Sequence, residues 1–300
     1  MSDNAIIVNE VGPRDGLQSQ AGHLDLAQRQ RFVEALLAAG LRHIEIGSFV
    51  SPKAVPQMAG TGDLAQALTA PPGSELTALV PNMKGYEFAR AAGVDTVAVV
   101  VSATETMNRK NINMGLDETM DVARAVIERG TKEGASVQAY LAVAFECPFE
   151  GATDAGRVRE LAASLIDAGA SQLVIADTIG AANPAEVRSL MDALVASHGA
   201  ALMSCHFHDT RALGLANVFA AIESGVRRFD ASVGGLGGCP FAPGAKGNVA
   251  TEDVVMLCEQ MGFSTGVNIP ALLEVVALIS DMLGSPQGGR AHYWLSRNAA

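Results

Sequence analysis

The sequence predicts an α/β protein in which eight parallel strands close into a (β/α)8 TIM barrel, with an additional C-terminal helix. The chain has 300 residues, 49% of them hydrophobic, which is enough for a large core. Short apolar runs alternate with amphipathic stretches along most of the chain, and eight such units can be counted. We expect a single TIM-barrel domain over 1–300, with the barrel at about 6–265 and the C-terminal helix and tail at about 269–300.

The predicted strands are short and rich in Val, Ile and Ala, as is typical of strands buried on both faces. The eight runs are IIVNEVG from Ile6, HIEIGSF from His43, ELTALVP from Glu75, TVAVVVSAT from Thr96, SVQAYLAVAF from Ser136, QLVIADT from Gln172, ALMSCHFHDT from Ala201 and RFDASVGG from Arg228.

Helical patterns separate these runs. DLAQRQRFVEALLAAG, LDETMDVARAVIERGTKEG and AGRVRELAASLIDAGA place apolar residues three and four apart, and often end at a Gly suited to a helix terminus. A doubly wound open sheet also alternates strand and helix. The first strand lacks a following GxGxxG fingerprint, so the closed barrel is favoured.

An apolar helix, IPALLEVVALISDMLG from Ile269, follows the eighth unit. Packing against the barrel is the favoured role for this helix, and a subunit interface in a homodimer or homotetramer is the alternative. The remaining tail, SPQGGRAHYWLSRNAA, is predicted to be irregular.

Charge and cysteine content restrict the class of protein. A formal net charge of −11 argues against sequence-independent binding of nucleic acid or an anionic membrane. The four cysteines are too scattered for a disulfide framework, which fits a reducing cytoplasm. No apolar segment is long enough to span a bilayer, and the first residues do not resemble a signal peptide.

Ionisable residues gather where the predicted strands end. Active sites of such barrels are built from the carboxyl ends of strands and the loops after them, so these residues are the candidates for chemistry. They are Glu10 and the segment Gly12–Gly16 with Arg14 and Asp15, then Glu45, Asp177, His206, His208, Asp209, and the Gly-rich loop with Cys239 and Asn248.

His206 and His208 are two apart in a strand, so their side chains point to the same face. A satisfied structural pair is the alternative, but the Asp15 carboxylate and the Asn248 amide at other strand ends favour a metal site. Two imidazoles, a carboxylate and an amide oxygen suit Mg²⁺ or Mn²⁺ and do not exclude Zn²⁺ or Co²⁺.

Two further side chains suit roles beside such a metal. Arg14 has the fixed cationic fork that stabilises a developing oxyanion, although an ion pair with Glu45 or Asp177 is the alternative. Cys239 lies in a Gly-rich loop that permits movement over a site, so its thiol suits a mobile proton donor.

Arg109 and Lys110, after the fourth strand, suit phosphate binding or a solvated surface equally.

Several segments together resemble the hydroxymethylglutaryl-CoA lyase family, within the wider group of metal-dependent lyase and Claisen-synthase barrels. The RDG and HxH elements are shared across that group, whereas the Cys239 loop and SFVSPK are particular to the lyases. The matching segments are GPRDGLQ at 12–18, SFVSPKAVPQM at 48–58, RKNIN at 109–113, CHFHDT at 205–210 and GGLGGCPFAPGAKGN followed by VATED.

The resemblance implies a divalent metal and cleavage of 3-hydroxy-3-methylglutaryl-CoA to acetyl-CoA and acetoacetate, as in leucine breakdown. The roles it implies are metal ligation by Asp15, His206, His208 and Asn248, enolate stabilisation by Arg14, protonation by Cys239, and acid–base chemistry by Glu45, Asp177 and His206. Either Asp177 or His206 is expected to accept the hydroxyl proton. We also expect Gln18 and Ser48, which lie in the matched segments, to contact the substrate.

The chain departs from the family pattern around the expected substrate. Ala54 stands where Trp is common, and Lys246 where a small hydroxyl residue is common, so a related 3-hydroxyacyl-CoA is an alternative substrate. A condensing acyltransferase of the isopropylmalate synthase type shares only RDG and HxH. A non-catalytic metal-binding barrel is the remaining alternative, and it gives no reason for Arg14 and Cys239 to accompany the metal set.

Overall fold

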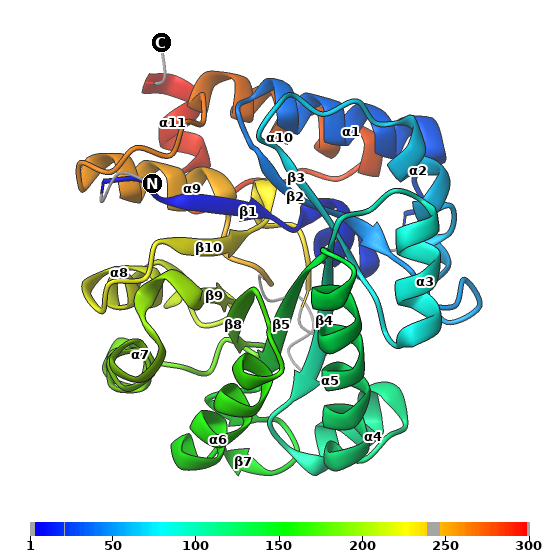
Figure 1. Ribbon diagram of the computed structural model, residues 1–300. Helices are drawn as coiled ribbons and strands as arrows, with labels where there is room; N and C mark the ends of the chain where they lie inside the picture. The colour runs from blue at the N-terminus through cyan, green and yellow to red at the C-terminus, as the bar shows by residue number, and fades with distance from the viewer. Residues whose placement is uncertain (1–3, 21, 239–246, 299–300) are drawn as a thin grey trace.

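A closed barrel of parallel strands forms the centre of the computed structural model, which describes residues 4–20, 22–238 and 247–298 (Figure 1). The strands neighbour one another in the order β1-β10-β9-β8-β5-β4-β3-β2. This confirms the TIM barrel over the open doubly wound sheet. The barrel strands are β1 (Ile7–Glu10), β2 (His43–Ser48), β3 (Glu75–Leu79), β4 (Thr96–Ser102), β5 (Ser136–Ala142), β8 (Gln172–Asp177), β9 (Met203–Phe207) and β10 (Arg228–Ala231).

Helices surround the barrel (Figure 1). They are α1 (Leu26–Ala38), α2 (Thr61–Ala67), α3 (Met83–Ala91), α4 (Glu105–Ile112), α5 (Leu116–Lys132), α6 (Ala155–Asp167), α7 (Pro184–His198), α8 (Gly214–Glu223), α9 (Thr251–Gln260), α10 (Ile269–Leu283) and α11 (His292–Asn298). A two-stranded antiparallel hairpin, β6 (Glu146–Cys147) and β7 (Gly151–Ala152), projects after β5. None of the helices in the described part of the chain has the length and apolarity needed to cross a membrane.

Local signals in the sequence explain where the helices begin. Asp25 caps α1 and forms a reciprocal capping box with Gln28, and Asn183 does the same with Glu186 at α7, where Pro184 occupies the first turn. The apolar stripe of each helix then packs on the strands, with Phe32 and Leu36 of α1 fully buried. These contacts fix the barrel and therefore the positions of its strand ends.

The C-terminal part of the chain confirms one expectation and corrects another. Helix α10 packs against α1 and α9, with Val276 and Ile279 buried, as predicted. The tail after it is not irregular throughout, because residues 292–298 form α11 and bury Leu295. Its sequence lacks helical periodicity because only one side chain of this short helix faces the core.

Arg29 is a buried cation that joins α1 to the barrel. Its Nη1 donates to the Ala59 carbonyl at 2.7 Å, and its Nη2 donates to the Ile46 carbonyl at 3.3 Å and to Thr61 Oγ1 at 3.2 Å. The β2–β3 register shifts between Glu45 and Gly47, so Arg29 binds the carbonyl of the residue at the irregularity. A Cβ at Gly47 would lie 2.8 Å from Arg29 Nη2, which explains the glycine.

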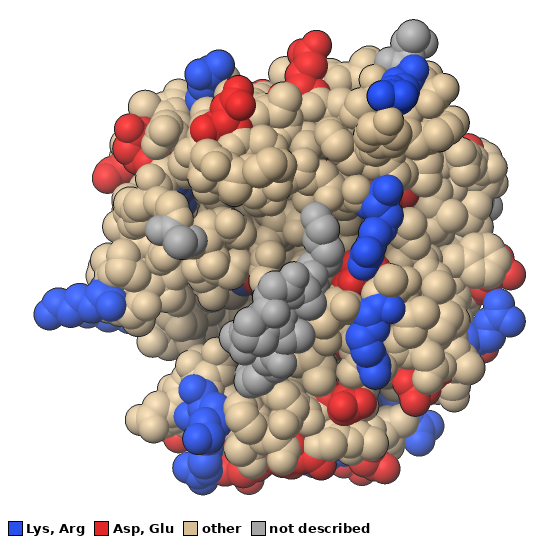
Figure 2. All heavy atoms as spheres, turned by 180° about the vertical axis from the view of Figure 1, so that it is seen from behind, with Lys and Arg blue, Asp and Glu red and all other residues tan. Residues whose placement is uncertain are grey.

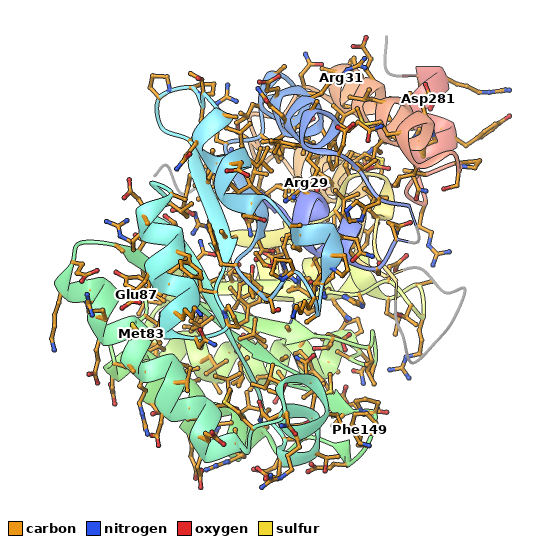
Figure 3. All side chains as sticks on the ribbon, turned by 90° about the vertical axis from the view of Figure 1, so that its right-hand side faces the viewer. Arg29, Arg31, Met83, Glu87, Phe149 and Asp281 are labelled. Atoms are coloured by element: carbon orange, nitrogen blue, oxygen red, sulfur yellow. The ribbon has the colours of Figure 1, made fainter. Side chains whose placement is uncertain are left out.

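Replacing Arg29 with Met should lower the free energy of unfolding by about 2 kcal/mol or more, because buried acceptors lose their donors. Arg31, which is exposed on the same helix, provides the matched control (Figure 3). Urea denaturation of Arg29→Met and Arg31→Met measures the difference. Equal stability of the two variants would show that Arg29 does not hold β2 in place.

Candidate metal centre and active site

Arg14 and Asp15 lie in a short turn of π-helix, Gly12–Gly16, directly after β1. Glu10 anchors this turn, since its carboxylate accepts hydrogen bonds from the Gly12 N–H at 2.8 Å, the Val233 N–H at 3.0 Å and the Thr251 hydroxyl at 2.6 Å. Burial raises the pKa of Glu10 to about 7, against the effect of these donors. The turn is therefore tied to the chain after β10 as well as to β1.

Asp15, His206 and His208 form a cluster at the carboxyl ends of β1 and β9. One potential ligand atom from each lies within 4.8 Å of the others. Burial alone would raise the pKa of Asp15, but Arg14 and both histidines hold it well below its usual range. The cluster thus presents a carboxylate and two imidazoles to one point, which is the start of a divalent-metal site.

His206 is oriented by an acidic residue on the neighbouring strand. Asp230 pairs with His206 in the β9–β10 register, and its Oδ2 lies 3.0 Å from His206 Nδ1. Since a carboxylate oxygen accepts, Nδ1 donates, which leaves Nε2 as the ring nitrogen available to a metal. Burial alone would lower the pKa of His206, but the hydrogen bond and charge of Asp230 raise it.

Asp230 was not among the residues predicted from the sequence. It also accepts hydrogen bonds from Asn9 Nδ2 at 2.8 Å and from the Tyr140 hydroxyl at 2.7 Å, so three strands besides β10 meet on it. The sequence feature that could have identified Asp230 is an acidic residue inside the apolar run RFDA. Closing the barrel places that run beside β9, and its carboxylate then meets an imidazole.

Asp230→Asn should weaken divalent-metal binding by about 10- to 100-fold, the range typical for a residue that orients a histidine ligand. Calorimetric titration with Mn²⁺ measures the affinity. Asp95→Asn is the control, because Asp95 is 86% exposed on its side chain and remote from the cluster. Equal Mn²⁺ affinity for Asp230→Asn and the unsubstituted protein would remove Asp230 from the metal centre.

Unlike His206, His208 has no described carboxylate that accepts a hydrogen bond from its Nδ1. Its Nδ1 is buried and has no hydrogen-bond partner among the described residues. Burial lowers the pKa of His208 to about 3, so the ring is neutral and keeps a lone pair for a metal. A buried imidazole nitrogen without a partner fits a site built for a further group.

Asn248 reaches the same cluster. Its chain segment pairs with the end of β9 through a bridge between His208 and Asn248, and its Nδ2 donates to Asp15 Oδ2 at 2.8 Å and to the Leu236 carbonyl at 3.1 Å. Gly237 has a φ of 125°, and a Cβ there would lie 2.8 Å from Asn248 Nδ2. In this arrangement the amide nitrogen faces Asp15, so ligation by the amide oxygen stays a prediction.

Arg14 forms two ion pairs, one with Glu45 and one with Asp15. Its Nε donates to Glu45 Oε2 at 2.7 Å and its Nη1 donates to Asp15 Oδ1 at 2.7 Å. Burial raises the pKa of Glu45 to about 7, although Arg14 opposes the change. The predicted alternative of a Glu45 ion pair is thus present, and it fixes the guanidinium beside the cluster instead of excluding it from chemistry.

Asp177 ends β8 on the same rim. Its carboxylate accepts hydrogen bonds from the N–H groups of Ala181 at 2.8 Å and Ala182 at 3.0 Å. Burial nevertheless raises the pKa of Asp177 to about 6. A carboxylate with a pKa near neutrality is suited to accept and return a proton.

The other predicted residues separate into three groups. Ser48 is buried, its Oγ has no hydrogen-bond partner in the described chain, and it lines a cavity of about 430 Å³ with Met58, Asn82 and Lys84. Gln18 is exposed, and Arg109 and Lys110 lie on α4, not in a loop. Cys239 and Lys246 lie outside the described residues.

Comparisons with known proteins agree with this geometry. Residues 5–279 match the model of the HMGL-like family. The chain belongs to this family. It is 43% identical to the hydroxymethylglutaryl-CoA lyase of Pseudomonas mevalonii, over 99% of this chain and 98% of the relative.

Two other family members differ in what they act on or bind. The (R)-citramalyl-CoA lyase of Chloroflexus aurantiacus is 40% identical over 94% of this chain and 92% of its own length. A solved HMG-CoA lyase from Acinetobacter baumannii, in complex with coenzyme A and 3-methylmalate, superposes with a TM-score of 0.92 at 34% identity, covering 99% of this chain and 96% of that one.

Proposed function

We propose that this member of the HMGL-like family is a divalent-metal-dependent carbon–carbon lyase that cleaves 3-hydroxy-3-methylglutaryl-CoA to acetyl-CoA and acetoacetate. The observation that carries the proposal is the contact of Arg14 with Asp15, inside a cluster completed by His206 and His208. The Arg14 guanidinium is thus held next to the position where the three side chains of the cluster could bind a metal. The relationship to the Pseudomonas mevalonii lyase supplies the chemistry that such a pair serves.

Asp15, His206 through Nε2, His208 and Asn248 would hold the metal. Mg²⁺ or Mn²⁺ fits the mixed nitrogen and oxygen donors and leaves room for substrate oxygens. When bound, the metal would lower the free energy of negative charge on the substrate's oxygens. The depressed pKa values of Asp15 and His208 keep both side chains deprotonated at neutral pH, as ligation requires.

Asp177 is the better fit of the two predicted proton acceptors. His206 uses Nδ1 to bind Asp230, and Nε2 is the nitrogen left for the metal, so neither nitrogen is spare. Asp177 has a pKa of about 6 and is held by two backbone donors. The C3 hydroxyl would pass its proton to Asp177 as the bond between C2 and C3 breaks.

Arg14 would stabilise the product of that cleavage. The electron pair of the broken bond passes to the thioester, which becomes the enolate of acetyl-CoA, while C3 becomes the ketone of acetoacetate. The guanidinium is already held by Glu45 and Asp15, so it need not reorganise as charge develops. Protonation of C2 is assigned to Cys239, as the resemblance implies.

The substrate is anionic, whereas the protein has a net charge of −11. The face turned toward the viewer in Figure 2 is hollowed, and lysine and arginine side chains stand around the hollow among acidic ones. Local positive charge at this rim would attract the phosphates of coenzyme A. Ser48, with its unpartnered hydroxyl in a cavity, is suited to contact the acyl part.

Citramalyl-CoA is the second candidate substrate, because the Chloroflexus aurantiacus relative is as similar as several HMG-CoA lyases. Parallel assays with both acyl-CoA esters and Mn²⁺ would decide between them by kcat/KM. We expect 3-hydroxy-3-methylglutaryl-CoA to be preferred. Free CoA released from acetyl-CoA and a 2-ketoacid would instead indicate a condensing enzyme.

We assign the activity to leucine breakdown in a reducing cytoplasm. Cys147, Cys205 and Cys258 are free and buried, which fits that compartment. Burial raises the pKa of Cys205 well above its usual value and that of Cys258 to about 12. These two thiols are therefore unreactive, consistent with the predicted role of Cys239 alone.

A further inference from the structure

The contrast between the two histidines raises the question of what holds His208. His206 is oriented through its ring by Asp230, whereas His208 Nδ1 has no partner within the described residues. The direction of the His208 ring must then depend on its backbone. The residue that follows it, Asp209, is only 7% exposed and is bound by three separate parts of the chain.

Two of these parts are the segment next to Asn248 and the first residue of α8. Its own N–H donates to the Gly247 carbonyl at 2.7 Å, next to Asn248, and its Oδ1 accepts from the Gly214 N–H at 3.0 Å, where α8 begins. These contacts connect the end of β9 to the loop that carries Asn248 and to α8. They leave Oδ2 of Asp209 for a further partner, and the Asp209 carbonyl, which accepts from the Ala212 N–H at 3.0 Å, can accept a second bond.

That partner is Arg290, from the tail between α10 and α11. Its Nε donates to Asp209 Oδ2 at 2.6 Å, and its Nη2 donates to the Asp209 carbonyl at 3.2 Å. One guanidinium thus holds both the side chain and the backbone of the residue after His208. The two-point geometry requires the planar fork of arginine.

The tail around Arg290 is itself fixed to the barrel. The N–H of Gly289 donates to Glu252 Oε1 at 2.7 Å, and the N–H groups of Arg290 and Ala291 donate to the Asp253 carboxylate at 2.6 and 2.9 Å. Glu252 and Asp253 are buried in the first turn of α9. Arg290 therefore projects from an anchored backbone and not from a loose end.

We propose that Arg290 is a positioning residue for the metal centre, acting through Asp209 to hold His208 in its ligating direction. The inference rests on the proposed metal site. Arg290 is 51% exposed on its side chain, and exposed ion pairs add little to stability. Its two bonds to Asp209 are thus better explained by placement of the neighbouring ligand than by the free energy of folding.

The test is a titration of Arg290→Ala with Mn²⁺ alone, followed by kinetics at limiting and saturating Mn²⁺. We expect the Kd for Mn²⁺ to rise by about 5- to 10-fold, near the lower end for residues that support ligands. Turnover should fall at limiting Mn²⁺ and return to nearly that of the unsubstituted protein at saturation. Arg290→Lys, which keeps the charge and one bond, should have an intermediate Kd.

Arg188→Ala is the matched control, because Arg188 is 52% exposed and, within the part of the chain that the structure describes, forms only a surface pair with Glu223. Both alanine variants should have similar Tm values, and Arg188→Ala should bind Mn²⁺ normally. An unchanged Kd in Arg290→Ala and Arg290→Lys would overturn the inference while leaving the metal site intact. A raised KM for the acyl-CoA that persists at saturating Mn²⁺ would overturn it in favour of direct substrate contact. If the unsubstituted protein bound no Mn²⁺, the metal site and the inference would fail together.

Discussion

Arg14→Gln lowers turnover by about two to three orders of magnitude while the protein keeps its metal; this is the largest kinetic effect that we expect. Glutamine is neutral, so the enolate would form without the cation that Glu45 and Asp15 now hold in place. In this variant the Arg14 guanidinium no longer competes with the metal for the Asp15 carboxylate, which stays free to bind the metal. Steady-state kinetics and elemental analysis of the same sample measure the two properties.

Two companion variants separate the role of Arg14 in chemistry from its role in structure. Arg14→Lys keeps the charge but cannot reach Glu45 and Asp15 with one planar group, so it should recover part of the activity. Arg14→Gln/Glu45→Gln removes the unpaired buried carboxylate that the single variant leaves, and it should unfold at a higher temperature than Arg14→Gln. Normal turnover in Arg14→Gln would exclude Arg14 from the mechanism.

Asp15→Ala should have the largest effect on metal binding. Asp15 supplies the carboxylate in the cluster of possible ligands, and it also accepts hydrogen bonds from Arg14 and Asn248. The affinity for Mn²⁺ should fall by at least about 100-fold, beyond the loss typical of a residue that only supports a ligand. Calorimetric titration and the metal content of the purified protein provide the measurement.

Asp121→Ala is the control for this variant, because Asp121 is exposed on α5 and pairs only with Arg124 among the interactions described. Asp15→Asn keeps the size of the side chain and removes its charge, so it should resemble Asp15→Ala in metal affinity. Retention of one tightly bound metal per chain in Asp15→Ala would place the metal elsewhere.

The sequence was sufficient for the fold because each barrel strand is a separate apolar run. The runs from His43, Thr96 and Ser136 begin at the first residues of β2, β4 and β5. Parallel strands buried on both faces give this signal without help from distant residues. Helix α11 gave no such signal, because Leu295 is its only buried side chain and the backbone just before it is held by Asp253, so it needs no apolar stripe of its own.

The site could be predicted only as far as residue type and strand position allow. His206 lies in β9 and His208 directly follows its end in extended backbone, so the two share a face, and Asp15 follows the end of another strand. Asp230 contacts His206 across 24 positions of the chain, and Arg290 contacts Asp209, the residue after His208, across 81 positions. Such contacts exist only after the barrel has closed, so no spacing in the sequence reveals them.

The acyl group is the least constrained part of the proposal. Of the two substitutions that bear on it, Ala54 lies in the loop after β2, and Lys246 falls outside the described residues. Ser48, by contrast, ends a barrel strand and is held in place by the strand. Arg14 and the cluster of Asp15, His206 and His208 lie at or directly after the ends of barrel strands, whereas the loops around them would determine which acid fits.

The most direct test of the central claim is a product assay on protein stripped of metal and then reloaded. Stripped protein should leave 3-hydroxy-3-methylglutaryl-CoA intact, and added Mg²⁺ or Mn²⁺ should restore equal amounts of acetyl-CoA and acetoacetate. Cleavage at the same rate without metal, or no cleavage of this ester with either metal present, would contradict the account.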